Sequence, residues 1–179
     1  LVENEEAARQ YVSYGESFIK ARINIPTLSL DESKFYYLGL ASVYSNFGYY
    51  ADNRGEKAKA LYYYQEALKI LEVLDDKREL GILYLNLSSL YHGMREFDIA
   101  LDYSEKALNE VQDIEDNDEL MVFALNNLAV LYNEMGDVEK SLQYQFKSLT
   151  ICDSTGNKFG AGMINNNIGG VYGQADNLE

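Results

Sequence analysis

Apolar and polar positions recur along this chain in blocks that are about 40 residues apart. Each block begins with Asn, continues with an apolar residue and ends in Tyr or Ala. Four blocks fit this description: Asn46–Ala51, Asn86–Tyr91, Asn127–Tyr132 and Asn167–Tyr172. Their first residues are separated by 40, 41 and 40 positions. A fixed period in this range is typical of a repeat protein, in which each repeat is one supersecondary unit.

A turn is predicted four residues after each block, at Gly55-Glu56, Arg95-Glu96, Gly136-Asp137 and Asp176-Asn177. Gly tolerates the left-handed conformation that ends a helix, and a carboxylate favours the N-terminus of the next helix. After the first three turns a small residue recurs at an interval of seven, as Ala60 and Ala67, Ala100 and Ala107, and Ser141 and Ser148. Seven residues are close to two helical turns, so each pair shares one face of a second helix. Small side chains on that face let a neighbouring helix approach closely.

The repeat unit is therefore predicted to be a helix, a tight turn and a second helix. The fold class is all-α, with seven or more helices in antiparallel pairs, because both halves of the unit have helical periods and no segment alternates with period two. Stacked pairs bury a shared core and coil into a superhelix. We expect one solenoid over residues 1–179, with an N-terminal helix and Pro-containing linker (1–30), three repeats (31–75, 76–116 and 117–156) and the first helix of a truncated fourth repeat (157–179).

The two ends of the chain carry their own expectations. Residues Glu5 to Ile23 have a helical pattern in which Ala8 and Gly15 echo the small-residue pairs, so this segment is interpreted as the second helix of a preceding repeat. Pro26 breaks that helix, and Asp31 is expected to cap the next one. The fourth repeat stops before its second helix, and the chain is interpreted as a fragment of a longer parent. Part of the apolar stripe left uncovered there is expected at Ile164, Ile168, Val171 and Tyr172.

The pattern Asn-Leu-Ala-x-x-Tyr, followed by Gly-Asp-x-x-x-Ser-Leu-x-Tyr, resembles the tetratricopeptide repeat. The resemblance is clearest from Asn127 to Leu149 and extends from about Phe35 to Glu179. It implies a right-handed α-α superhelix that binds a protein or an extended peptide. The period of 40 to 41 residues exceeds the usual period of about 34. It is similar to the longer subclass found in kinesin light chains, bacterial peptide-sensing regulators and the sensor segments of bacterial histidine kinases. Ala51 departs from the pattern, since the other blocks have Tyr at that place.

Charge and hydropathy restrict the partners. The formal net charge of −14 would repel a phosphate backbone, and no Lys/Arg cluster forms a basic patch, so we expect no nucleic-acid binding by this segment. No stretch approaches the roughly 18 apolar residues of a membrane span, so we expect no membrane contact by it either. The compartment stays open between cytoplasm and periplasm, because Cys152 is the single cysteine and the parent could carry a membrane anchor outside this segment.

The residues that catalysis needs are scarce. The chain has one His, His92, and one Cys, Cys152, and repeat stacking places them on different helices of different repeats. A hydrolase of the nucleophile type needs a base close to Ser or Cys, and a zinc site needs three or four closely spaced ligands. We therefore predict no catalytic residue, no metal site and no cofactor, and interpret the chain as a protein without enzymatic activity.

The resemblance implies that the first helix of each pair lines a concave surface. Projection of the repeat at helical spacing gives the candidate partner-binding residues Ser45, Tyr49, Asp52, Leu85, Ser89, His92, Phe123, Asn126, Val130, Asn133 and Asn166. They mix amides, hydroxyls and apolar groups with little positive charge, so a clamp of Lys and Arg for a C-terminal carboxylate is not expected. Tyr91, Tyr132 and Tyr172 are interpreted as core residues.

The Asn at the start of each block leaves two alternatives. The ladder Asn46, Asn86, Asn127 and Asn167 could bond a neighbouring helix, or it could bridge the backbone N–H and C=O of an extended peptide. The second amides Asn126, Asn133 and Asn166 are the stronger candidates for ligand binding.

Three functions remain open at this point. The first is a peptide-binding or protein-binding module that forms the sensory or docking segment of a larger, bacterial signalling regulator. The second is a structural adaptor in a multiprotein assembly, and the third is an accessory domain of an enzyme. A weak homodimer through the C-terminal end is a further expectation, because a second copy would cover the stripe left bare there.

Overall fold

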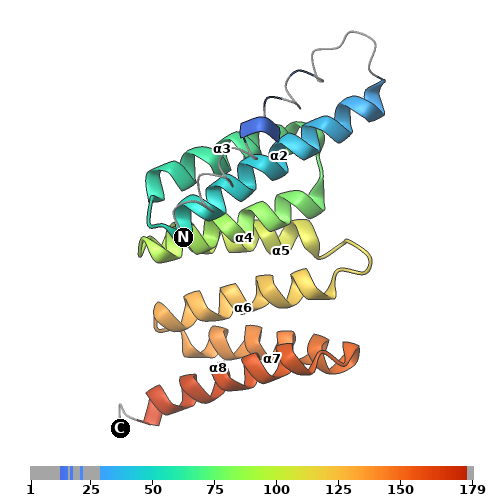
Figure 1. Cartoon of the computed structure of the whole chain (residues 1–179). Coiled ribbons are helices and arrows are strands. Elements are labelled where there is room, and N and C mark those ends of the chain that lie inside the picture. Colours follow the sequence, from blue (N-terminus) through green and yellow to red (C-terminus); the bar gives the residue numbers. More distant parts are fainter. Residues whose placement is uncertain (1–12, 16, 18–20, 22–28, 177–179) are drawn as a thin grey trace. The chain divides into compact units, whose positions relative to one another are not determined.

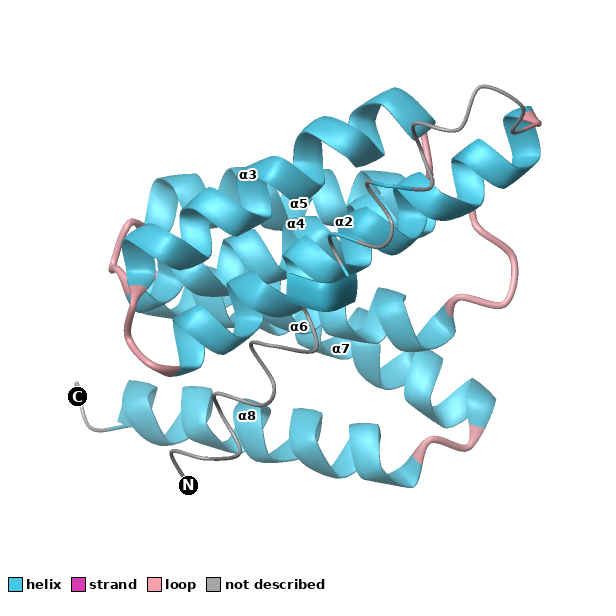
Figure 2. Cartoon of the chain, turned by 45° about the horizontal axis from the view of Figure 1, so that its top comes forward, coloured by secondary structure: helices cyan, strands magenta, loops and turns pink. Residues whose placement is uncertain are grey.

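The computed structural model describes residues 13–15, 17, 21 and 29–176 (Figure 1). Residues 29–176 form seven consecutive helices joined by short turns: α2 (Leu30–Asn53), α3 (Lys57–Leu74), α4 (Lys77–Gly93), α5 (Phe97–Val111), α6 (Asp118–Glu134), α7 (Val138–Thr155) and α8 (Lys158–Asp176). Among the described residues there is no β-strand (Figure 2). The prediction of an all-α fold built from helix pairs is confirmed.

The chain divides into two compact units, Leu1–Asp76 and Lys77–Glu179. The first unit contains α2 and α3, and the second contains α4 to α8. The expected helix from Glu5 to Ile23 lies mostly outside the described residues; residues 13–15, 17 and 21 of it are described and are helical. The arrangement of the whole chain as one solenoid with the repeat boundaries given above stays a prediction.

In the first unit, α2 begins with a capping box. The hydroxyl of Ser29 accepts a hydrogen bond from the backbone N–H of Glu32 (3.2 Å), and the Glu32 carboxylate accepts one from the backbone N–H of Ser29 (2.9 Å). The bonds from Ser29 to the ionised carboxylate lower the pKa of Glu32. The expectation that Asp31 caps this helix is wrong, because Asp31 lies in the first turn and the cap is two residues earlier.

In the second unit, the first helices of successive pairs form one layer. α4 contacts α6, and α6 contacts α8. Each second helix packs against its own first helix and against the next one, so that α5 contacts α4 and α6, whereas α7 contacts α6 and α8 (Figure 1). This is the arrangement that stacked helix pairs need in order to share a core.

The turns inside the three helix pairs end the first helix in the same way. Each has a left-handed residue at the predicted place: Gly55 (φ 74°), Arg95 (φ 63°) and Gly136 (φ 84°). The N–H of the following acidic residue then bonds the carbonyl five residues earlier, in the pairs Glu56 to Ala51 (2.9 Å), Glu96 to Tyr91 (3.0 Å) and Asp137 to Tyr132 (2.8 Å). This is a Schellman motif, and it confirms the first three predicted turns. At the fourth, Asp176 is the last residue of α8 and Asn177 lies outside the described residues.

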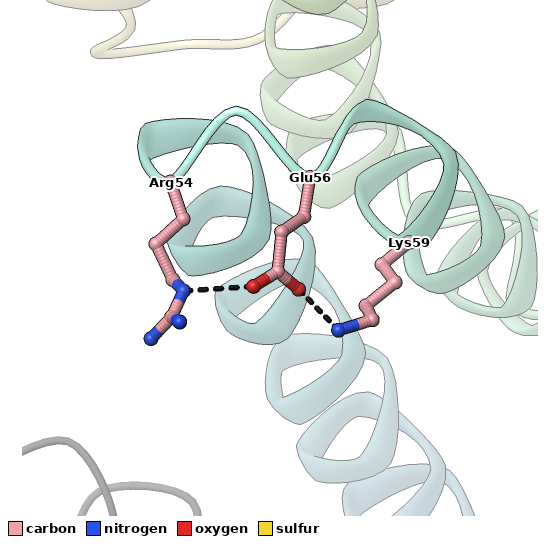
Figure 3. A network of polar contacts seen from close by, with 3 residues as sticks. All are labelled: Arg54, Glu56 and Lys59. Atoms are coloured by element: carbon pink, nitrogen blue, oxygen red, sulfur yellow. Dashed lines mark hydrogen bonds and ion pairs between the residues drawn. The ribbon is translucent and has the colours of Figure 1, made fainter.

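The acidic residue after the left-handed position has different roles in the first and third turns. The Glu56 carboxylate accepts a hydrogen bond from Arg54 (2.9 Å) and pairs with Lys59, and the bond from Lys59 is the main cause that lowers the pKa of Glu56 (Figure 3). Asp137 instead caps α7 by accepting a bond from the backbone N–H of Lys140 (3.0 Å). The carboxylate favours the helix start in both turns, but only in the third does it act as a cap.

The second helices bury one stripe with the spacing i, i+4, i+7 and i+11. The stripe residues are Ala60, Tyr64, Ala67 and Leu71 in α3; Ala100, Ser104, Ala107 and Val111 in α5; and Ser141, Gln145, Ser148 and Cys152 in α7. All six of the predicted small residues have 0% exposed surface. The prediction that each pair shares one face of its second helix is thereby confirmed.

The expected uncovered stripe on α8 is wrong for three of its four residues. Ile164, Ile168 and Val171 are buried, and the first two form one apolar cluster with Cys152 and the neighbouring Leu149 of α7. The helix-pair register assigned this face to a following helix, whereas α7 already covers it. Tyr172 is 51% exposed, as the expectation required.

The tyrosine series is therefore not uniform. Tyr132 is 8% exposed and stacks on Tyr144 of α7 with ring centroids 5.6 Å apart, and half-buried Tyr91 stacks in the same way on Tyr103 of α5. The interpretation as core residues holds for Tyr132, holds in part for Tyr91 and is wrong for Tyr172. The difference arises because Tyr91 and Tyr132 stack on a tyrosine of their own second helix.

Candidate binding face

Seven of the eight candidate residues of the second unit lie at exposed or half-buried positions on the first helices α4, α6 and α8. We call this surface the open face; it consists of Ser89, His92, Phe123, Asn126, Val130, Asn133 and Asn166. Phe123 is 45% exposed, Ser89 and Asn166 are exposed, and the remaining four are half-buried. On α6, by contrast, Leu125, Leu128 and Leu131 are buried on the opposite side. Because α6 contacts both α4 and α8, the open-face residues lie on three neighbouring helices.

Leu85 does not belong to the open face, although helical projection places it there. It is 9% exposed and is buried with most of its neighbours on α4. Its equivalent in the third repeat is Asn126, which is half-buried. A ligand on the open face would therefore meet a polar side chain on α6 where α4 presents none.

The side-chain amides of Asn126 and Asn167 bond to each other. The Asn167 side-chain amide donates a hydrogen bond to the Asn126 side-chain carbonyl (2.9 Å), which joins α8 to α6. Asn167 is the last member of the Asn ladder, so at this rung the ladder bonds a neighbouring helix. The equivalent pair one repeat earlier is Asn127 and Leu85, and Leu85 has no amide.

His92 and Glu134 connect the C-terminal ends of α4 and α6. His92 Nε2 lies 3.1 Å from Glu134 Oε1. The two side chains are 35% and 39% exposed. The His92 ring also lies 5.9 Å from the ring of Phe97 at the start of α5. His92 and Glu134 therefore lie side by side across the contact between α4 and α6, at the edge of the open face.

The three candidates of the first unit lie on α2. Tyr49 is 53% exposed, Ser45 is half-buried, and the Asp52 carboxylate pairs with Lys57 at the start of α3. Asp52 thus has a structural partner across the turn between α2 and α3. These residues are equivalent by register to Leu85, Ser89 and His92 of the second unit.

Two segments of the chain match known sequence families. Residues 79–154, inside the second unit, match a family model described as tetratricopeptide repeat, and residues 40–74, inside the first unit, match a second model with the same description. Together the two matches cover more than half of the chain. The chain belongs to the tetratricopeptide repeat family.

Relatives and solved structures agree with this assignment. The tetratricopeptide repeat chain is 28% identical over 144 residues to response regulator aspartate phosphatase E of Bacillus subtilis (strain 168), a match that covers 78% of this chain and 38% of the relative. The chain thus spans about two fifths of that relative's length. By fold it is similar to BtubC (BKLC) from P. vanneervenii, with TM-score 0.62, 18% identity and coverage of 97% of this chain and 76% of the other.

A second solved structure is a signal transduction ATPase with numerous domains (STAND) protein with a tetratricopeptide repeat sensor, from Pyrococcus horikoshii. Its TM-score is 0.73 at 19% identity, and the match covers 95% of this chain and 25% of the other. At these identities the two structural likenesses show the fold. Tetratricopeptide repeats generally bind proteins or peptides, which is the coarse function that the family supports.

Sequence projection missed Glu134 and the bond between Asn126 and Asn167. Glu134 follows Asn133 directly, and its equivalent in the second repeat is Gly93, so the comparison of repeats gave no reason to select it. The spacing of 41 between Asn126 and Asn167 was the available signal for the second feature. Equivalent neighbours in stacked repeats lie one period apart, so two amides at about that distance can meet.

The single cysteine of this tetratricopeptide repeat chain lies away from the open face. Cys152 is buried in the α7 stripe, and burial raises the pKa of its thiol. Within residues 29–176 and the few described earlier, no three His, Cys, Asp or Glu side chains converge as metal ligands would. In the same part of the chain, no helix combines the length and the apolar character that crossing a bilayer requires.

Proposed function

We propose that the open face binds an extended peptide or an extended segment of a partner protein. The observation that carries the proposal is the set of partly exposed amide, hydroxyl and apolar side chains at equivalent places on three neighbouring first helices. Second helices cover the other side of this layer. An extended ligand could cross α4, α6 and α8 in turn, meeting equivalent positions one period apart.

The chemistry of the open face indicates what such a peptide should contain. Phe123 at 45% exposure and its α8 equivalent Met163 at 38% offer apolar contact, so the peptide should carry at least one large apolar side chain. The exposed amide of Asn166 can both donate to and accept from a peptide backbone. No Lys or Arg occurs among the open-face residues, and Glu134 adds a carboxylate at the edge. A neutral or basic peptide therefore suits this surface better than an acidic one.

We further propose that this binding serves a larger signalling regulator. Support comes from the names of two similar proteins: one is a response regulator aspartate phosphatase, and the other is a STAND protein in which the tetratricopeptide repeats are the sensor. Since the chain spans a minor part of both, the activities of those whole proteins are not assigned to it.

The test of peptide binding uses a displayed library of random 12-residue peptides, selected on the purified chain. Enriched peptides are then measured by fluorescence anisotropy against Phe123→Ala and Asn166→Ala. We expect each change to weaken binding about threefold to tenfold or more, as the loss of one net hydrogen bond or of one apolar contact does. Asn126 is less suited to this test, because its bond to Asn167 also stabilises the helix layer.

A matched control separates the open face from general exposure of aromatic rings. Phe146 on α7 is 48% exposed, close to the 45% of Phe123, but it lies on a second helix. Phe146→Ala should leave the affinity unchanged. If the selected peptides lose affinity with Phe146→Ala and keep it with Phe123→Ala, the open face is not the binding surface.

The complete sequence of the gene tests the signalling part. An attached kinase, ATPase or DNA-binding domain would support a regulator. A product made of repeats alone would contradict it and favour a structural adaptor.

A further inference from the structure

Helix α8 exposes a face whose equivalents on α4 and α6, the two preceding first helices of the second unit, are buried. Gly162, Asn165, Gly169 and Tyr172 lie at helical spacing on α8, and all four are exposed. Their equivalents by the repeat period are Gly81, Tyr84, Ser88 and Tyr91 on α4, and Val122, Leu125, Ala129 and Tyr132 on α6. Seven of these eight equivalents are buried, and Tyr91 is half-buried.

The equivalents are covered by the second helix of their own repeat. The hydroxyls of Ser88 and Ser104 are 2.6 Å apart across the contact between α4 and α5. A Cβ added to Gly81 would collide with Val111 of α5. Tyr132 stacks on Tyr144 of α7 with an interplanar angle of 7°. The face on α4 and α6 is therefore the site where a second helix packs.

On α8 the same site is empty within the described part of the chain. A Cβ added to Gly162 or Gly169 would meet no heavy atom within 4 Å, and the Tyr172 ring is 51% exposed. We call Gly162, Asn165, Gly169 and Tyr172 the α8 seat. It continues the interface that α4 forms with α5 and that α6 forms with α7, so its occupant should be a helix of the second-helix type.

The sequence contains one more segment of that type. The second helices share a small residue, Tyr three positions later, a small residue at seven and an apolar residue at eleven. The pattern is Ala60-Tyr63-Ala67-Leu71, Ala100-Tyr103-Ala107-Val111 and Ser141-Tyr144-Ser148-Cys152 in the three helix pairs, and Ala8-Tyr11-Gly15-Ile19 near the N-terminus. A tyrosine three residues after the first small residue is what the α8 seat needs opposite Tyr172, because Tyr103 stacks on Tyr91 and Tyr144 stacks on Tyr132 at the equivalent places.

The described part of the N-terminal segment supports this register. A Cβ on Gly15 would lie 3.9 Å from Val43 of α2. The equivalent of Val43 on α8 is Ile164, which is buried in one cluster with Cys152 and Leu149 of α7. Gly15 thus lies against the position of α2 whose equivalent on α8 packs against α7. In this segment, Arg9 and Glu16 stand where the three second helices have leucines.

We propose that the α8 seat binds the N-terminal segment, residues 8–19, of a second copy of this chain, so that copies associate head to tail. The contact joins two different surfaces, so each added copy leaves one seat and one segment open, and association does not stop at a dimer. A single-helix interface is small, so the association is weak. With a net charge of −14 on every copy, it should tighten as salt screens the repulsion.

Sedimentation velocity of the full chain over a concentration series provides the first test. Gly169→Lys places a long charged side chain in the α8 seat, where the added Cβ meets no heavy atom of the described residues within 4 Å and Lys is a better helix former than Gly. Its matched control is Gly170→Lys, because Gly170 is also unobstructed but is equivalent to Ser89 and Val130 on the open face. We expect the unaltered chain to associate. The association constant of Gly169→Lys should be at least tenfold lower than that of the unaltered chain, and that of Gly170→Lys should be unchanged.

Mixing two variants identifies the occupant. Ala8→Lys blocks the segment and keeps the seat, whereas Gly169→Lys blocks the seat and keeps the segment. Each variant alone should remain monomeric, and an equimolar mixture should form a dimer and nothing larger, because only one productive contact remains. Circular dichroism of each variant checks that its helices are intact.

The other outcomes overturn the proposal. A chain that stays monomeric at every concentration and salt level has no such contact. Association that survives Gly169→Lys does not use the α8 seat. Association that survives Ala8→Lys, or variants that fail to complement each other in the mixture, would show that the seat is occupied by something other than the N-terminal segment.

Discussion

The first two repeats build the same helix crossing in opposite ways. In α2 and α3 the crossing pairs Gly48 with the buried ring of Tyr64, and a Cβ on Gly48 would lie 2.5 Å from that ring. At the equivalent place in α4 and α5, Ser88 and Ser104 share a hydrogen bond of 2.6 Å. Glycine makes room for a large side chain in one repeat, and two small polar side chains meet in the other.

The third repeat has an intermediate solution. Its equivalent residues are Ala129 and Gln145, both buried in α6 and α7. The three crossings differ in residue type, but the sizes of the two residues compensate each other. The largest residue of the second helices, Tyr64, lies opposite the smallest residue of the first helices, Gly48. Packing selects the combined volume of the pair, because interiors tolerate neither a void nor an overlap.

The largest effect is expected from emptying the crossing of the first repeat. Tyr64→Ser copies the second-repeat residue at this place but leaves a cavity beside Gly48, because Gly48 has no side chain to fill it. We expect a loss of about 3–5 kcal/mol in the free energy of unfolding, as for other large-to-small changes in a core. Urea denaturation followed by circular dichroism measures it.

Tyr62→Ser on the same helix is the control. Tyr62 is 56% exposed, so its loss should change stability by less than about 0.5 kcal/mol. Equal losses for the two variants would contradict the central place of Tyr64 in this crossing.

A smaller effect is expected from filling the glycine side of the same crossing. Gly48→Ala should destabilise the chain by about 1–3 kcal/mol, because the new Cβ overlaps the Tyr64 ring. Gly169 is the equivalent residue on α8, and there the added Cβ meets nothing within 4 Å. Gly169→Ala should therefore stabilise α8 by about 0.5–1 kcal/mol through helix propensity alone.

Thermal unfolding of the two variants, followed side by side, checks the opposite signs. If both glycines respond in the same direction, the contrast between a filled and an unfilled crossing is wrong. Gly48→Ala should also cost less in a chain that already carries Tyr64→Ser, since the two residues touch.

The comparison also shows how far sequence reasoning reaches. The period of 40 to 41 residues predicted the helix pairs, three of the four turns and the small-residue stripe, because these depend on spacing and on backbone conformation. Spacing did not reveal that Leu85 is buried on α4 or that Asn126 bonds Asn167. Both depend on which side chain one repeat presents to the next, and the repeats differ at these places.

Helix α8 set the second limit. The repeat register predicted that Ile164 and Ile168 are bare, because it assigned their face to a second helix that is not among residues 157–179. Helical spacing groups residues on a face but does not say which neighbour covers that face. In the structure α7 covers it, and the exposed side of α8 is instead the one that carries Gly162 and Gly169.

The hydroxyl pair of the second repeat offers a test of intermediate size. Ser88→Ala removes one hydroxyl and leaves that of Ser104 buried without this partner, so we expect a loss of about 1–2 kcal/mol. The double variant Ser88→Ala with Ser104→Ala removes both polar groups and should recover most of that loss. Denaturant titration of the four members of this cycle gives the coupling energy directly. A double variant as unstable as the sum of the two singles would contradict a specific bond between the hydroxyls.

The smallest effect is expected at the third crossing, where Gln145 occupies the place of Tyr64. Gln145 is 1% exposed, and its side-chain N–H donates to Ser141 (3.3 Å), but its carbonyl oxygen has no hydrogen-bond partner within the described residues. Gln145→Met keeps the length of the side chain and removes the unpaired carbonyl. The gain from removing a buried unpaired acceptor exceeds the loss of one long hydrogen bond, so we expect stabilisation of about 1 kcal/mol.

Gln143→Met on the exposed side of α7 is the control and should change stability by less than about 0.5 kcal/mol. Urea midpoints of the two variants decide the matter, because a destabilising Gln145→Met would mean that the third crossing depends on its polar group as the second one does.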